Sequence, residues 1–340
     1  MSVPPEQMRY LLRIRQKLPL NLKVKYTLRR ISMWYEHFDG MVYVAFSGGK
    51  DSTVLSHLVH SLYPNVPLVF ADTGNELDSV CEFVATYGDR VTVVRPKMTF
   101  DEVIEKYGYP VINKEQAQRI WEVRNTKSQK LRDIRMNGYP NGSGKISEKW
   151  KFVIDAPFKV TSKCCGILKC APSAIYGKQT GRKEIVGTMA GESRLRFQTY
   201  VKNGCNAFDL KSPASRPLMF WTEQDVLRYI VDNRLGIAGA YGNIVDEGGT
   251  LRTTGEERTG CKQCLFGAHK DAENRIQRLA RIEPESYRHA IEDLHYDVVM
   301  DYLGIEWRPL KDVSVKADPQ LDLFVPSSEK LKAATNGDSE

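Results

Sequence analysis

Between residues 41 and 97 the sequence alternates between short apolar runs and longer amphipathic stretches. The runs MVYVAF, VPLVFADTG and RVTVVRP have the composition of buried strands, and the segments between them carry apolar residues at helical spacing. Further along, EIVGTMA resumes the strand pattern. Strands that alternate with helices are typical of a parallel sheet with right-handed crossovers. The chain is therefore expected to be an α/β protein with a parallel twisted sheet flanked by helices.

The first predicted strand runs into the loop SGGKDS and then into a helix. Gly48 and Gly49 allow a tight turn with open amide groups, Ser47 and Ser52 add hydroxyls, Lys50 adds a positive charge, and the helix offers its positive N-terminal end. These features suit a phosphate or pyrophosphate. The spacing differs from the P-loop of common NTPases and from the Gly-x-Gly-x-x-Gly dinucleotide pattern.

The loop resembles the pyrophosphate loop (PP-loop) of the adenine nucleotide alpha-hydrolase superfamily, which includes ATP pyrophosphatases and the reductases of adenylylsulfate (APS) and phosphoadenylylsulfate (PAPS). The segments FADTGNEL and GTMAGESRLR also resemble segments of this superfamily. The resemblance implies a Rossmann-like PP-loop fold that binds ATP and Mg²⁺. It assigns nucleotide binding to Ser47, Gly48, Gly49, Lys50, Ser52, Asp72, Thr73, Gly74, Glu192 and Ser193.

The same resemblance assigns catalytic roles to Lys50, Asp51 and Arg196, with Asp51 or Asp72 as a candidate ligand of the Mg²⁺ ion. The sequence departs from the family at Met189, where relatives usually carry a basic residue. Contacts from Arg196 to a phosphate group are expected, but the exact group that it binds does not transfer from the family.

The chain has seven cysteines, and in a reducing compartment these favour metal ligands, catalytic groups or buried side chains over disulfides. Adjacent Cys164 and Cys165, together with the pair Cys261 and Cys264, can hold an iron–sulfur cluster or, with poorer geometry, zinc. KCCGILKCAP and GCKQC resemble the cysteine segments of APS reductases that carry a [4Fe-4S] cluster, and imply such a cluster on these four residues. Cys170 stays open as a replacement ligand or a free thiol.

The sequence also suggests an organisation into segments. Residues 1–40 are expected to form a helical N-terminal cap, and residues 41–235 the PP-loop nucleotide-binding domain with a basic insertion at 114–151. Residues 236–312 are expected to form a helical region that carries the second cysteine pair, and residues 313–340 a disordered tail.

The formal net charge of +7 favours an anionic partner without naming one. The insertion holds ten basic and four acidic residues, and both a solvated helical face and a surface that follows a phosphate backbone fit this composition. A membrane span needs about 18 apolar residues, and no run approaches that length. We therefore expect a cytoplasmic protein that does not bind membranes.

Sulfonucleotide reductases carry a catalytic cysteine near the C-terminus, whereas no cysteine follows Cys264 here. The pattern therefore looks closer to the iron–sulfur ATP pyrophosphatases of DNA phosphorothioation, the Dnd and Ssp systems. We expect an enzyme that adenylates an oxygen of a nucleic acid, with a DNA backbone phosphate preferred over tRNA, and receives sulfur from a cysteine desulfurase. An APS or PAPS reductase, a tRNA thiolation enzyme and a non-catalytic subunit are the alternatives. The oligomeric state is open, with a homodimer as one option.

Overall fold

A mixed six-stranded sheet forms the centre of the larger part of the molecule. The computed structural model describes residues 4–310, so the predicted tail from residue 313 lies outside the described residues. The strand order is β3–β2–β1–β4–β6–β5, and only the pairing of β5 with β6 is antiparallel. The strands are β1 (Val42–Ala45), β2 (Leu68–Ala71), β3 (Val91–Val94), β4 (Lys183–Val186), β5 (Asn206–Ala207) and β6 (Ala214–Ser215). The expected α/β fold with a largely parallel sheet is confirmed.

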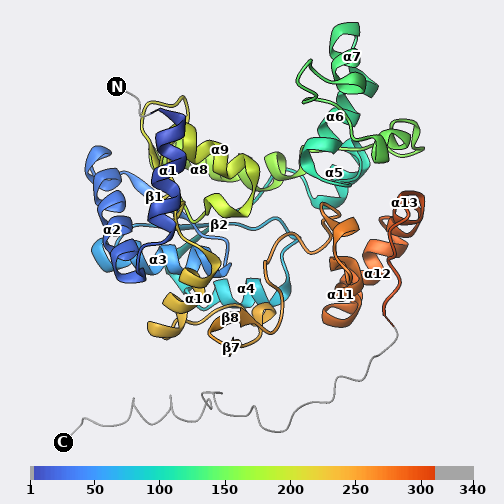
Figure 1. Cartoon of the computed structure of the whole chain (residues 1–340). Helices are drawn as coiled ribbons and strands as arrows, with labels where there is room; N and C mark the ends of the chain where they lie inside the picture. Colours follow the sequence, from blue (N-terminus) through green and yellow to red (C-terminus); the bar gives the residue numbers. More distant parts are fainter. Residues whose placement is uncertain (1–3, 311–340) are drawn as a thin grey trace, which may run out of the picture.

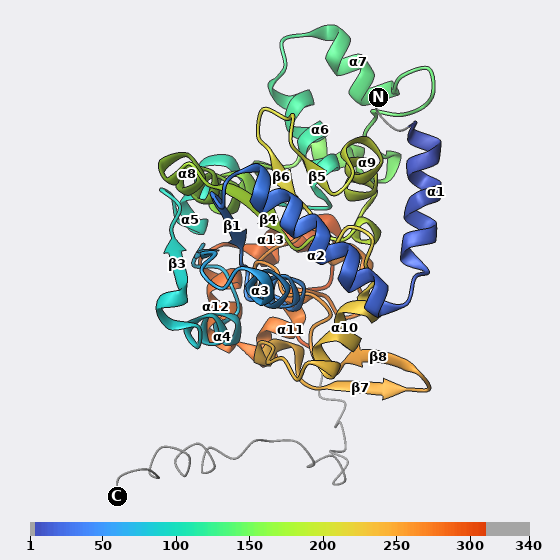
Figure 2. The same cartoon turned by 90° about the vertical axis from the view of Figure 1, so that its left-hand side faces the viewer.

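Helices cover the two faces of this sheet (Figures 1 and 2). Val42 and Val44 of β1 point into the main core, where they join apolar residues of α2 and α3. Tyr43 points to the opposite face, where its hydroxyl group donates a hydrogen bond to the Ser173 carbonyl of α8. The helices of this part are α1 (Pro5–Gln16), α2 (Leu20–His37), α3 (Lys50–Leu62), α4 (Asp78–Ala85), α8 (Ala171–Thr180), α9 (Arg194–Asn203) and α10 (Glu223–Asp232).

A second hydrophobic core joins the expected insertion to the C-terminal helices, which lie together on the right of Figure 1. Val123 of α6 and Val153 of η2 pack there with Ile276 of α11 and Val299 of α13. The elements are α5 (Phe100–Tyr107), α6 (Lys114–Asn125), α7 (Gln129–Asn137), η2 (Glu148–Asp155), α11 (Arg275–Ile282), α12 (Pro284–Glu292) and α13 (Tyr296–Leu303). The segment boundaries drawn from the sequence stay predictions, but residues 114–151 pack mainly with this second core.

A short hairpin connects the two parts of the chain. It pairs β7 (Ile244–Glu247) with β8 (Thr250–Thr253), follows the short turn η5 (Gly239–Tyr241), and leads into the second cysteine pair. Among residues 4–310, no helix is long and apolar enough to cross a membrane.

Candidate active site

The loop between β1 and α3 has the tight geometry that its glycines predict. Gly48 has a φ of +69°, and a Cβ atom there would lie 2.7 Å from Val84 Cγ2 and 2.8 Å from Val80 Cγ1. Glycine is therefore needed both for its backbone conformation and for its contact with α4. The Ser52 hydroxyl group donates to the Gly49 carbonyl (2.8 Å) and accepts a hydrogen bond from the Ser47 amide (3.2 Å). These bonds fix the turn that leads into α3.

The start of α3 can bind an anion. Its first residues have no intrahelical acceptor for their amide groups, and these groups carry the positive end of the helix dipole. Gly187, at the end of β4, lies directly against this turn, because a Cβ atom there would be 3.0 Å from the Asp51 carbonyl oxygen. The carboxyl ends of neighbouring strands β1 and β4 thus meet at the helix start, which is where ligands bind in open α/β sheets.

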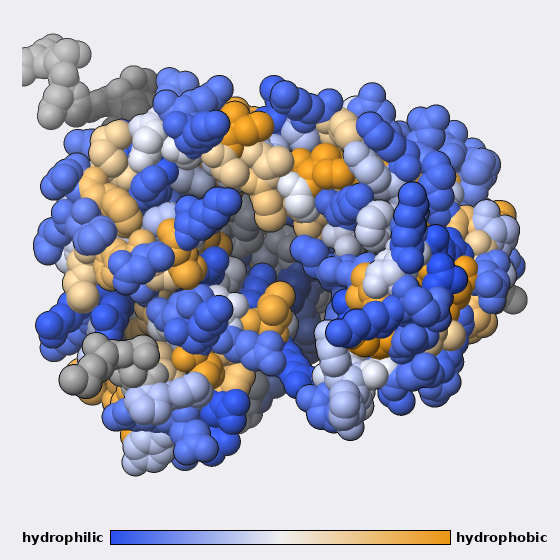
Figure 3. Space-filling view, turned by 90° about the horizontal axis from the view of Figure 1, so that it is seen from above, coloured by the Kyte–Doolittle hydropathy of each residue, from blue (hydrophilic) through white to orange (hydrophobic). Residues whose placement is uncertain are grey.

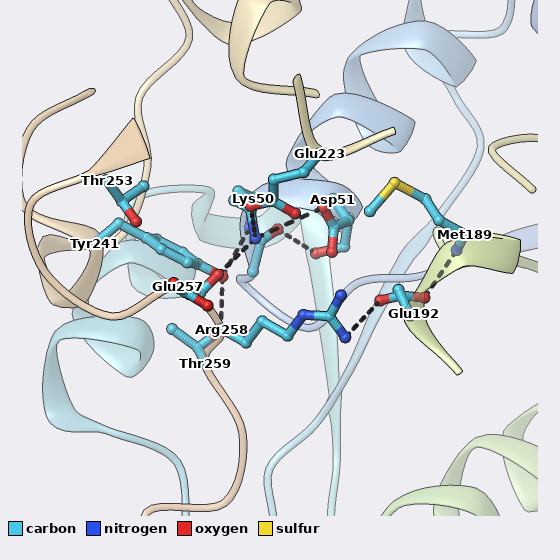
Figure 4. Close-up of polar contacts among 12 residues, drawn as sticks. Lys50, Asp51, Met189, Glu192, Glu223, Tyr241, Thr253, Glu257, Arg258 and Thr259 are labelled. Atoms are coloured by element: carbon cyan, nitrogen blue, oxygen red, sulfur yellow. Dashed lines mark hydrogen bonds and ion pairs between the residues drawn. The ribbon is translucent and has the colours of Figure 1, made fainter. Parts of the chain in front are cut away.

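Lys50 is buried at the start of α3, and both its ammonium group and its backbone amide face other protein groups (Figure 4). Its ammonium group donates to the Glu257 carbonyl (2.7 Å) and lies 3.0 Å from a carboxylate oxygen of Glu223. Its backbone amide donates to the Tyr241 hydroxyl (3.1 Å), which in turn lies 2.9 Å from the Thr259 hydroxyl. A segment almost two hundred residues away therefore covers the phosphate loop.

Asp51 is largely buried, and burial raises the pKa of its carboxyl group above the ordinary value, against the opposing effect of Lys50. Among the described residues, its Oδ1 atom has no hydrogen-bond partner and forms only a long ion pair with the Lys50 ammonium group (3.9 Å). A buried carboxylate oxygen without a hydrogen bond is costly. It is suited to accept a ligand group or a cation.

Two arginines and one carboxylate form the opposite wall. Glu192 lies in the short turn η4 (Ala190–Glu192), and its carboxylate accepts a hydrogen bond from the Met189 amide (2.8 Å). Arg196 of α9 pairs with Glu192. Arg258 lies 3.7 Å from the second oxygen of Glu192, as Figure 4 shows. Arg258 thus brings a second guanidinium group to a segment in which Met189 replaces the usual basic residue.

These groups line one large cleft of about 940 Å³. A deep hollow near the centre of one molecular face is visible in Figure 3. The predicted site residues that line the cleft are Ser47, Gly49, Lys50, Asp51, Ser52, Glu192 and Arg196. The structure therefore brings the phosphate loop together with the Glu192 segment, although some 140 positions of sequence separate them.

The other predicted nucleotide-binding residues, Gly48, Asp72, Thr73, Gly74 and Ser193, lie beside the cleft but do not line it. Asp72 pairs with Arg95 (2.9 Å) and accepts a hydrogen bond from the Gly74 amide (3.1 Å), and Ser193 caps α9. Thr73 donates to the carboxylate of Glu76, which itself lines the cleft. The assignment of these residues to nucleotide binding stays a prediction.

Glu76 links the cleft to the cysteines. Its carboxylate lies 3.2 Å from the ammonium group of Lys169, which also lines the cleft and is close enough to the Cys261 thiol for the two groups to shift each other's pKa. Burial alone would lower the pKa of Lys169, but Cys261 and Glu76 raise it above the ordinary value. The neighbouring Asn75 accepts hydrogen bonds from the amides of residues 262 and 263, so the same turn also anchors the second cysteine pair.

The four predicted ligand cysteines approach one another from two segments. Cys164 and Cys165 precede η3 (Gly166–Cys170), a single π-helical turn of the kind often found at functional sites. The interaction between the two adjacent thiols raises the pKa of Cys164 and lowers that of Cys165 to about 6. Burial, together with the neighbouring Cys261 and Cys165, raises the pKa of Cys264 to about 11. All four thiols are free.

In the described part of the chain, no three His, Cys, Asp or Glu side chains already surround a common point as metal ligands do. The chemistry of the donor set nevertheless fits an iron–sulfur cluster, because four thiols interact and one has a pKa low enough to be ionised at neutral pH. Cys170 is exposed at the end of η3 and lines the cleft, and burial and the nearby Cys165 raise the pKa of its thiol.

Several residues that line the cleft carried no assignment from the sequence: Glu76, Lys169, Gly187, Tyr241, Arg258 and Thr259. Lys169 lies inside the KCCGILKCAP segment, Glu76 inside FADTGNEL and Gly187 at the start of GTMAGESRLR, so three of them had a signal in motifs already identified. Tyr241, Arg258 and Thr259 lie outside those motifs. Their position in the cleft depends on contacts between segments that are far apart in the sequence.

A family model for the phosphoadenosine phosphosulfate reductase domain matches residues 41–264. An adenosine 5'-phosphosulfate reductase of Bacillus cereus is 22% identical over 263 residues, which span 76% of this chain and 87% of that protein. An uncharacterized protein of Methanocaldococcus jannaschii is 34% identical over 92 residues, 25% of this chain and 22% of its own.

Two solved structures were compared with this one. A phosphoadenylyl-sulfate reductase from Candida auris in a phosphate complex is 15% identical, with a TM-score of 0.38. The match covers 74% of this chain and 98% of the reductase chain. The U34-tRNA thiolase NcsA from Methanococcus maripaludis with its [4Fe-4S] cluster is 14% identical, with a TM-score of 0.34, over 88% of this chain and 86% of its own.

Proposed function

Because the chain belongs to the phosphoadenosine phosphosulfate reductase domain family, we propose that it is an ATP pyrophosphatase that adenylates an oxygen of a nucleic acid for replacement by sulfur. The observation that carries the proposal is that one cleft contains both the phosphate loop and Lys169, whose side chain contacts Cys261. A site of this kind can activate an oxygen and receive sulfur at neighbouring positions.

In the first step, an acceptor oxygen attacks the α-phosphorus of ATP, and the bond from this phosphorus to the bridging oxygen of pyrophosphate breaks. The amide groups at the start of α3 and the Lys50 ammonium group would stabilise the charge on the leaving pyrophosphate. Lys50 would exchange its contact with Glu223 for phosphate oxygens, because the Glu223 side chain is partly exposed and can move away. Arg196 and Arg258, paired with Glu192, would orient the acceptor or the α-phosphate.

The Oδ1 atom of Asp51, which accepts no hydrogen bond and lies 3.9 Å from the Lys50 ammonium group, is the group best suited to hold Mg²⁺ together with phosphate oxygens. When bound, the ion would supply positive charge to the phosphates. No other carboxylate that lines the cleft is described as both buried and without a hydrogen-bond partner.

In the second step, a sulfur nucleophile attacks the adenylated atom and AMP leaves with the former acceptor oxygen. A cysteine desulfurase is the proposed source of this sulfur, and a thiol would supply the two electrons that reduce the persulfide sulfur to the sulfide level, leaving as a disulfide. Cys164, Cys165, Cys261 and Cys264 would hold a [4Fe-4S] cluster, which when bound would supply either a site for sulfur or a structural anchor. Lys169 would hold the cysteine segment in a fixed position beside the cleft through its interactions with Cys261 and Glu76.

The test is to purify the full chain without oxygen, measure its iron, sulfide and visible absorption, and assay pyrophosphate and AMP release from ATP with and without DNA. The Lys50→Met variant should lose pyrophosphate release, whereas Lys17→Met, at the exposed end of α1, should keep it. Urea unfolding of both variants separates a lost fold from a lost activity. Pyrophosphate release that persists in a folded Lys50→Met protein would refute the proposal.

A reductase is the second candidate, since the 22% identical relative is an adenosine 5'-phosphosulfate reductase and Cys170 presents an exposed thiol to the cleft. In that reaction a thiolate attacks the sulfur of adenylylsulfate and a thiol donor completes the reduction to sulfite. Sulfite release from adenylylsulfate with thioredoxin, lost in Cys170→Ser, would establish it and exclude the thiolation proposal.

A further inference from the structure

The cleft extends well beyond the phosphate loop, across one face of the sheet. Tyr43 of β1 and Glu184 of β4 are register partners near the amino ends of their strands, and both line the cleft together with Ala45 and Val186. Parallel sheets are normally covered on both faces, whereas the cleft leaves this part of the sheet face open. From Lys183 to Gly187 the cleft follows β4 for about 13 Å, at roughly 3.3 Å per residue.

Helix α8 forms the roof of this extension and contacts the sheet near both of its ends, through the Ser173 carbonyl, which accepts a hydrogen bond from the Tyr43 hydroxyl group, and through Gly177. A Cβ atom on Gly177 would lie 3.1 Å from the Arg182 carbonyl oxygen and 3.4 Å from Tyr43 Cε1. The far mouth of the cleft is therefore bounded by the end of α8, the start of β4 and the loop before β6.

Three lysines surround this far mouth: Lys178 of α8, Lys183 of β4 and Lys211 of the loop before β6. Lys178 and Lys211 are exposed and Lys183 is half-buried. In the region from residue 4 to 310, the lysines that form ion pairs are others, namely Lys23, Lys50, Lys151, Lys169 and Lys262. Among residues 4–310, the three lysines at the mouth thus form no ion pair, although the Glu184 carboxylate lines the same part of the cleft.

Glu184 is the carboxylate that lies closest in sequence to this mouth. Burial raises the pKa of its side chain above the ordinary value, and Arg216 acts in the opposite direction. The cleft lining at this mouth holds Lys178, Lys183, Lys211 and Arg182 against this one carboxylate, so the far mouth has a net positive character.

The basic insertion is the competing surface for a polyanion, but many of its cations hold the fold together. Arg124 donates four hydrogen bonds to backbone carbonyls between residues 153 and 158. Arg135 pairs with Glu122, and Arg119 pairs with Glu115 and donates to the Lys145 carbonyl. None of residues 114–151 lines the cleft.

We propose that a single strand of DNA enters the cleft at its far mouth, with backbone phosphates on Lys178, Lys183 and Lys211, and reaches the phosphate loop along β4. This inference rests on the proposed function and names the path of its acceptor. A cleft of 940 Å³ is near the upper end of the roughly 300–1,000 Å³ that single-ligand sites occupy, so it has room for a nucleotide and part of a strand.

The test compares two triple charge reversals of equal net change: Lys178→Glu with Lys183→Glu and Lys211→Glu, and, as the control, Lys127→Glu with Lys130→Glu and Lys149→Glu. The control lysines are exposed residues of the insertion. Fluorescence anisotropy of a labelled single-stranded DNA oligonucleotide, measured over a series of salt concentrations, gives affinity and salt slope. ATP binding without DNA reports separately on the phosphate loop.

We expect the mouth variant to weaken DNA binding by at least about tenfold and to reduce the salt slope by about 2, at about 0.7 per phosphate contact. The control variant should retain wild-type slope and DNA-stimulated pyrophosphate release. Loss of binding in the control variant alone would overturn the far-mouth path but leave the proposed function intact. A wild-type chain that releases pyrophosphate without any response to DNA would overturn both. If the mouth variant also loses ATP binding, the single Lys211→Gln variant decides, with an expected slope reduction of about 0.7.

Discussion

Replacing Gly48 by alanine tests whether the phosphate loop needs both a left-handed backbone and a close approach to α4. A left-handed conformation costs alanine about 1–2 kcal/mol. The added methyl group would lie 2.7 Å from Val84 and 2.8 Å from Val80, both buried, and such overpacking costs typically about 1–3 kcal/mol. We therefore expect Gly48→Ala to lower the free energy of unfolding by roughly 2–5 kcal/mol.

A matched glycine separates the two contributions. Gly248, in the turn between β7 and β8, has a φ of +64° and no heavy atom within 4 Å of an added Cβ. Gly248→Ala should cost only the backbone part, about 1–2 kcal/mol. Urea unfolding of both variants, with equal m values, should differ by about 1–3 kcal/mol. ATP binding should weaken in Gly48→Ala and stay unchanged in Gly248→Ala. Equal losses of stability in the two variants would refute the close-packing argument.

Three further substitutions test the site and its support. Burial raises the pKa of Asp51, so its stabilising contribution is full below the unfolded pKa and is lost as the pH rises through the folded pKa. Asp51→Asn should thus resist urea better than the wild type at about pH 8, with no advantage near about pH 4; a constant difference would contradict this. Arg124→Lys should lower the free energy of unfolding by about 2–4 kcal/mol, because lysine cannot serve four carbonyls, and a loss below about 1 kcal/mol would count against that role. Lys169→Met should reduce both iron content and pyrophosphate release, and unchanged iron would show that its contact with Cys261 is dispensable.

Most secondary structure could be predicted from the sequence, because its signals are local. Thr222 was expected to cap a helix, and its hydroxyl group accepts from the Asp225 amide at the start of α10. The glycines of SGGKDS predicted a tight anion-binding turn, and Gly48 has the left-handed φ that such a turn uses. Local patterns could not show that Lys50 would be buried under Tyr241, since that contact joins residues 191 positions apart.

The sequence by itself determined the α/β alternation, the phosphate loop and the two cysteine pairs, because periodicity, turn residues and ligand spacing act over a few neighbouring positions. Tertiary structure alone decided that Arg258 and Thr259 complete the cleft, that Glu76 and Lys169 connect it to Cys261, and that the basic insertion packs with the C-terminal helices. These outcomes depend on which apolar surfaces of the chain pack together in the two hydrophobic cores. Burial of apolar surface has no direction of its own, so the partners it brings together emerge only when the whole chain has folded.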